Sequence, residues 1–110
     1  MQQTELKAAS DILLCAADCI TERAAQRDKP DGERSMARAV ASFNALTEHR
    51  LSERDGWLFM AILKAARAQG SLHHIDDYVD MAAYSALAGE CAEAKYGPAA
   101  YEFAMPAGKP

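Results

Sequence analysis

The sequence predicts an all-α protein, a four-helix bundle-like single domain with a central antiparallel helical hairpin and an irregular C-terminal tail. Half of the 110 residues are apolar and alanine is abundant, whereas β-branched residues, which favour strands, are few. Apolar residues recur at spacings of three and four along most of the chain. Prolines lie only near residue 30 and beyond residue 95. We therefore expect a helical domain over 1–95 and a C-terminal tail over 96–110.

Two helices are expected before the hairpin. The first is predicted over about 4–27 and the second over about 33–48, because each segment carries an apolar stripe at helical spacing. Between them, Pro30 and Gly32 interrupt the periodicity, as is typical of a loop.

The first helix of the hairpin is predicted over about 52–67. Ser52 and Asp55 form a variant of the capping box, with Asp in place of Glu or Gln. Gly70 is typical of the residue that follows a helix end. A helix that is apolar all round is normally buried. We expect burial of the large residues that cover most of its circumference: Trp57, Leu58, Phe59, Met60, Ile62 and Leu63.

The second helix of the hairpin is predicted to start near His74 and to end before Gly97 and Pro98. Asp76 and Asp77 fall in its first turn, where the helix dipole favours negative charge. Because the connection to the preceding helix is only a few residues long, the two helices should pack antiparallel.

Charged residues interrupt the apolar pattern of the hairpin. In an antiparallel pair, Lys64 and Asp80 would meet as a partly buried ion pair, because a lone buried charge is costly. One interpretation is a structural ion pair at the edge of the hairpin. The alternative is a ligand site, in which Lys64 or Arg67 contacts a phosphate, or Asp77 and Asp80 hold a metal. Tyr84 shares the face of Asp80 and belongs to this candidate site.

A second candidate site surrounds the first loop. Arg27 and Arg34 flank this loop, and the start of a helix offers free N–H groups that favour anions. An anion or a nucleotide phosphate could therefore bind between them. The alternative is a solvated helix end with salt bridges, because Asp28, Asp31 and Glu33 are interleaved with the basic residues.

Composition excludes several classes of protein. A net charge of −4 argues against a nucleic-acid binder, which needs a basic surface. No apolar run approaches the ~20 residues of a membrane span, and no signal peptide is evident, so we expect a cytoplasmic protein. Three cysteines fit a reducing compartment. Cys15 and Cys19 do not show a known zinc spacing with His73 and His74.

The chain resembles a family of small phage and prophage proteins that is grouped as a domain of unknown function. The resemblance covers about residues 12–90, and its most specific part is Leu-Lys-x-x-Arg at 63–67 followed by Asp-x-x-Asp-x-x-x-Tyr at 77–84. If the chain is phage-encoded, its expected location is the cytoplasm of the host cell. The family implies no established activity.

The same pattern is distantly similar to the all-α nucleoside triphosphate pyrophosphohydrolases of the MazG type. Those enzymes hold Mg²⁺ with carboxylates at i, i+3 spacing on two facing helices. By this resemblance, Asp77 and Asp80 match half of the motif, whereas the facing helix offers Lys64 and Arg67 in place of acids. A lysine at that position would repel the metal.

We therefore expect a non-enzymatic phage accessory protein, a helical homo-oligomer that binds a host protein or a nucleotide-like ligand and needs no cofactor. Few helices and many apolar residues leave surface to be covered by other copies. The alternative is a divergent Mg²⁺-dependent nucleoside triphosphate pyrophosphohydrolase. A DNA-binding regulator is the third hypothesis, and the acidic balance argues against it.

Overall fold

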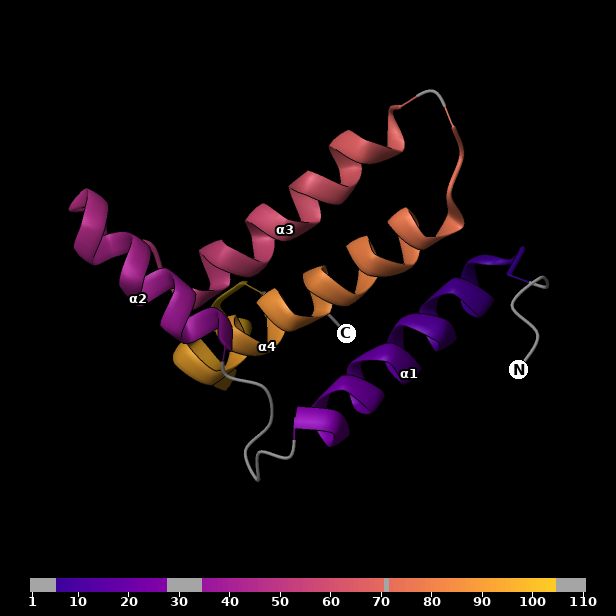
Figure 1. The fold of residues 1–110 in the computed structure, drawn as a ribbon. Helices are drawn as coiled ribbons and strands as arrows, with labels where there is room; N and C mark the ends of the chain where they lie inside the picture. The colour runs from indigo at the N-terminus through magenta and orange to yellow at the C-terminus, as the bar shows by residue number, and fades with distance from the viewer. Residues whose placement is uncertain (1–5, 28–34, 71, 105–110) are drawn as a thin grey trace.

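The fold is built from α-helices alone in the part of the chain that the structure describes. This computed structural model describes residues 6–27, 35–70 and 72–104, with backbone only at 24–27 and 98–104. The helices are α1 (Ala9–Arg27), α2 (Ser35–Thr47), α3 (Glu53–Ala68) and α4 (Ile75–Ala104). Figure 1 shows α3 and α4 side by side and antiparallel, α1 along another side of α4, and α2 crossing near the start of α3. The all-α prediction and the antiparallel hairpin are confirmed.

The predicted capping box fixes the start of α3. The Ser52 hydroxyl accepts the Asp55 N–H at 3.1 Å, and the Asp55 carboxylate accepts the Ser52 N–H at 2.8 Å. These two reciprocal bonds satisfy helix-terminal donors that would otherwise lack partners. Hydrogen bonding to the carboxylate, first from the Ser52 backbone N–H and then from the Ser52 side chain, lowers the pKa of the Asp55 carboxyl below its ordinary value.

The corner between α2 and α3 is held by one side chain. The Asn44 amide donates to the Leu51 carbonyl and accepts the Leu51 N–H, both at 2.9 Å. At the end of α2, Glu48 adopts a φ of 61° and its N–H donates to the Asn44 carbonyl at 2.7 Å. The chain therefore leaves α2 through a left-handed residue and enters α3 through a capped one.

The core is made of small residues. The innermost side chains are Val79, Ala83 and Ala88 of α4, each at most 3% exposed, together with Ala16 of α1 and Ala61 of α3. Small side chains allow helix backbones to approach closely, as the alanine spacing of the hairpin predicts. No large side chain of the described residues is fully buried.

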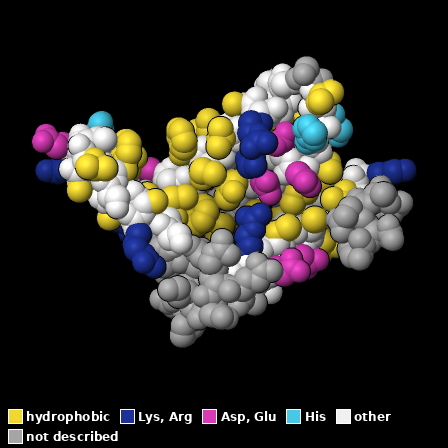
Figure 2. Space-filling view, viewed as in Figure 1, with side chains coloured by type: hydrophobic (Ala, Val, Ile, Leu, Met, Phe, Trp, Pro, Cys, Tyr) yellow, Lys and Arg dark blue, Asp and Glu magenta, His cyan; other side chains and the backbone are white. Residues whose placement is uncertain are grey.

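The expectation that α3 is buried on all sides is wrong. Phe59 and Ile62 are 65% and 63% exposed, Leu58 and Leu63 are also exposed, and Trp57 is half-buried. The reason is that, among the described residues, α1 packs mainly against α4, so α3 is covered chiefly by α4 and, near its start, by α2. Figure 2 shows hydrophobic side chains gathered over α2 and the adjoining part of α3.

Two helix boundaries differ from the sequence-based expectation. α1 begins at Ala9 because the Asp11 carboxylate accepts the Ala8 N–H at 3.3 Å and so caps the helix there. A helix end was predicted before Gly97. The structure has a kink there, because Gly97 has non-helical angles (φ 66°, ψ −163°). Beyond the kink the backbone is helical again to Ala104, where we expected an irregular tail.

Candidate functional site

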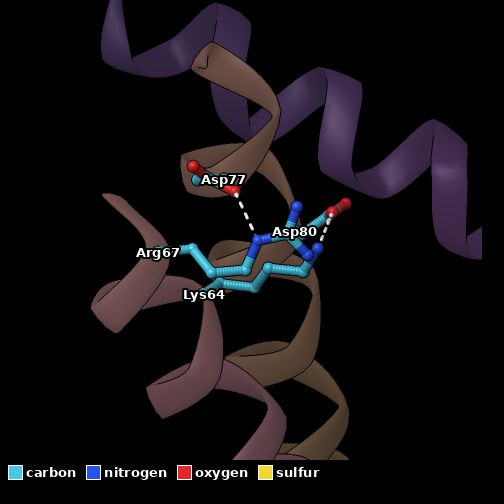
Figure 3. A network of polar contacts seen from close by, with 4 residues as sticks. All are labelled: Lys64, Arg67, Asp77 and Asp80. Carbon is cyan, nitrogen blue, oxygen red and sulfur yellow. Dashed lines mark ion pairs between the residues drawn. The ribbon is translucent and has the colours of Figure 1, made fainter. Parts of the chain in front are cut away.

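The centre of the hairpin brings four predicted site residues together. Figure 3 shows Lys64 and Arg67 of α3 facing Asp77 and Asp80 of α4. The Lys64 Nζ lies 3.1 Å from the Asp80 Oδ2, and the two side chains are only 14% and 19% exposed. The predicted partly buried ion pair is therefore present.

The second contact in this cluster is longer and asymmetric. The Arg67 Nε lies 4.0 Å from the Asp77 Oδ1. The Asp77 side chain is 6% exposed, whereas the Arg67 side chain is 61% exposed. Asp77 is thus the deeply placed acid, and most of the Arg67 guanidinium remains accessible to solvent.

The charges of this cluster oppose a divalent cation. Asp77 and Asp80, which the sequence suggested as metal ligands, each already face a cation. Mg²⁺ would instead need further oxygen ligands around it. Among the described residues, no group of three or more His, Cys, Asp or Glu side chains is arranged to hold a metal. The cluster is better suited to hold the hairpin together or to offer the exposed Arg67 to an anion.

Tyr84 belongs to a separate aromatic pair further along the hairpin. Its ring stacks on Trp57, with centroids 5.8 Å apart and an interplanar angle of 21°. The Trp57 indole N–H donates to a Glu53 carboxylate oxygen at 3.4 Å. Tyr84 is therefore engaged in packing between α3 and α4.

The other predicted residues are only partly placed. Arg27 is the last residue of α1, and its side chain lies outside the described residues, as does Arg34 entirely. The anion site around the first loop therefore stays a prediction. On α1, burial and the neighbouring Cys15 raise the pKa of the Cys19 thiol, which keeps this thiol protonated at neutral pH.

A cavity that the sequence analysis missed lies beside the start of α3. It measures about 630 Å³ and lies between the N-terminal turns of α3 and the later turns of α4. Arg50 and Arg54 flank the Ser52 cap, and this i, i+4 pair of cations at a helix start was an available signal. The residues that line the cavity are Arg50, Ser52, Glu53, Arg54, Asp55, Trp57, Leu87, Glu90, Cys91, Ala92, Ala94, Lys95 and Tyr96.

The fold and the site define a class: a small all-α protein organised on an antiparallel hairpin that is joined by charged pairs. Within that class, the family model of a domain of unknown function, DUF6378, matches residues 11–92. The chain therefore belongs to the DUF6378 family. Neither a curated protein nor a solved structure matches it. None of its described helices is long and apolar enough to cross a membrane.

Proposed function

We propose that this protein acts by binding, as a non-enzymatic accessory protein that assembles into a homo-oligomer. Its assembly surface is the α2–α3 apolar face, defined by the exposed large residues of α2, α3 and their connection. The observation that carries the proposal is the size of this face. Its members are Phe43, Leu46, Leu51, Leu58, Phe59, Ile62 and Leu63.

The exposed area of this face is large for a protein that stays monomeric. Leu46 is 85% exposed and Phe59 and Ile62 exceed 60%. Together the members expose roughly 700 Å² of apolar surface, against ~300–600 Å² for the largest patch of a typical monomer and ~800 Å² per partner in a standard interface. The area is thus what one side of a stable dimer requires.

The charge of the same face favours a second copy as the partner. Arg38 is the only charged residue in α2, and the apolar stripe of α3 at positions 58, 59, 62 and 63 contains no charge. A two-fold contact places the same surface on both sides, so like charges would repel across it. A nearly uncharged apolar face avoids that cost.

The experiment is light scattering or analytical ultracentrifugation of the purified chain at micromolar concentration. We expect a dimer or larger oligomer for the natural sequence and a folded monomer for the double variant Phe59→Asp, Ile62→Asp. Leu72→Asp is the matched control, because Leu72 is 69% exposed but lies outside the face. A natural chain that is monomeric at these concentrations would contradict the proposal.

The phage origin, the host cytoplasm as location, and a host protein or nucleotide-like molecule as ligand belong to the same proposal and rest on the resemblance. The ion pairs of Asp77 and Asp80 argue against the alternative, a Mg²⁺-dependent pyrophosphohydrolase distantly similar to the MazG type. Pyrophosphate release that requires Mg²⁺ and is lost in Asp80→Asn would favour that alternative instead.

A further inference from the structure

The outer side of α3 carries a seam of regularly spaced residues. Phe59, Ile62, Ala66 and Gln69 recur at spacings of three and four, and all four are exposed. This spacing is typical of the contact seam between two paired helices. We infer that two copies pair through this seam with their α3 helices antiparallel, so that Phe59 contacts Ile62 of the partner subunit. The inference rests on the proposed self-association and adds the orientation of the partner.

The charges at the two ends of α3 favour the antiparallel orientation. The first turn carries the acids Glu53 and Asp55, and the last turn carries the cation Arg67. In a parallel two-fold pair each of these residues would lie beside its own copy, so like charges would repel at both ends. In an antiparallel pair the acidic turn of one copy lies beside the basic turn of the other. The helix dipoles favour the same orientation, because opposite ends of the two dipoles come together.

The register of the pair follows from the most exposed large residues of the seam. Phe59 and Ile62 are 65% and 63% exposed, and they bury the most apolar area when they lie opposite each other across the two-fold axis. The same register places Arg67 at the level of the acidic first turn of the partner's α3. The Arg67 side chain is 61% exposed and lies 4.0 Å from its own Asp77, so its guanidinium remains available to a carboxylate of the partner.

Helix α2 widens the same contact. It packs near the start of α3, beside the place where the last turn of the partner's α3 would lie (Figure 1). Phe43 and Leu46 of α2 are exposed, and Figure 2 shows hydrophobic side chains of α2 and of the adjoining part of α3 on one face of the molecule. An antiparallel pair therefore brings the end of each α3 toward the α2 of the other copy, and the two-fold axis repeats this contact.

The sign of one substitution distinguishes the two orientations. In the antiparallel pair, Arg67→Gln removes an attraction that the two-fold axis repeats, and it should raise the dissociation constant about threefold or more. In a parallel pair the same change would remove a repulsion and lower that constant. Analytical ultracentrifugation over a concentration series measures the constant, and circular dichroism verifies the fold. Arg23→Gln on α1 is the matched control, because this exposed arginine lies outside the α2–α3 apolar face and should leave association unchanged.

A carbodiimide cross-link tests the register directly. Arg67→Lys keeps the positive charge and supplies an amine, which condenses with a nearby carboxylate to an amide while the carbodiimide takes up the water. We expect mass spectrometry to find position 67 joined to Glu53 or Asp55. Within one α3 these positions are ~18 Å or more apart along the helix axis, so this link can form only between copies. A mixture of unlabelled and heavy-isotope-labelled chains verifies that the link joins two chains.

Two outcomes would overturn the inferred orientation in a chain that associates. They are an unchanged or lowered dissociation constant in Arg67→Gln, and the absence of a cross-link between the two ends of α3. A natural chain that stays monomeric would instead contradict the proposed self-association, on which the orientation depends. Ultracentrifugation of the natural chain therefore separates the two failures.

Discussion

The two faces of α3 are built in opposite ways. The face toward α4 carries the small residue Ala61 and the ion-paired Lys64, whereas the outer face carries Phe59 and Ile62, which are mostly exposed. Close backbone contact and charge pairing therefore hold the single chain together, while the larger apolar side chains remain available to a partner. The comparison teaches that the residues that stabilise the single chain and the residues of the proposed assembly surface lie on opposite faces of one helix.

The largest effect is expected at the ion pair of the inner face. Lys64→Met leaves the Asp80 carboxylate, which is 19% exposed, without its cation and should lower the free energy of unfolding by about 3 kcal/mol. Arg67→Met should cost under about 1 kcal/mol, because that pair is longer and its cation is exposed. Urea denaturation measures both. Equal losses in the two variants would show that burial does not distinguish the pairs.

The next effect is expected where α2 meets α3. A Cβ at Gly56 would overlap the Met36 Sδ and lie 2.9 Å from the Val40 Cγ2. Gly56→Ala should therefore destabilise the protein by about 1–2 kcal/mol, even though alanine favours helix. Gly89→Ala is the matched control, because nothing lies within 4 Å of its Cβ, and it should stabilise the protein by up to about 1 kcal/mol. The midpoint of urea denaturation should fall in Gly56→Ala and rise in Gly89→Ala.

A smaller effect is expected at the capping box. Ser52→Ala should cost about 1 kcal/mol. The folded-state pKa of Asp55 lies below its ordinary value of 3.8. The ionised carboxylate therefore stabilises the folded state fully above pH 3.8, and this stabilisation is lost as pH falls through the folded pKa. Asp55→Asn should therefore flatten the acid side of the stability curve, as followed by denaturation between neutral pH and about pH 2. If stability fell equally with decreasing pH in Asp55→Asn and in the natural chain, the lowered pKa of Asp55 would be contradicted.

The smallest effect on a single chain is expected on the outer face. Phe59→Gln removes an exposed side chain and should change the stability of the monomer by no more than about 0.5 kcal/mol. In the natural chain, association should make the thermal midpoint rise with protein concentration. The variant should show a weaker dependence. A large loss of monomer stability in Phe59→Gln would show that this face is part of the core.

The sequence predicted the local features well because each depends on near neighbours. The Ser52–Asp55 box follows from spacing alone, and the meeting of Lys64 with Asp80 follows from a short connection between antiparallel helices. The exposure of Phe59 was missed because periodicity shows that α3 is apolar, but not that α1 would cover α4 instead. That choice depends on long-range packing.

The cavity was missed for a similar reason. Arg54 and Tyr96 lie far apart in the sequence, and the pair Arg50 and Arg54 at the helix start does not by itself indicate that Tyr96 lies nearby. They meet only because α4 extends past the start of α3 as far as its kink at Gly97. No short-range pattern encodes that overlap.

The pair of hydrogen bonds from Asn44 to Leu51 has a consequence for the order in which the molecule is made. It closes a segment of only seven residues, and loops of about ten residues close in ~10–100 ns. The corner therefore depends only on residues close in sequence, and we expect it to form early in folding, before the more distant contacts between α3 and α4.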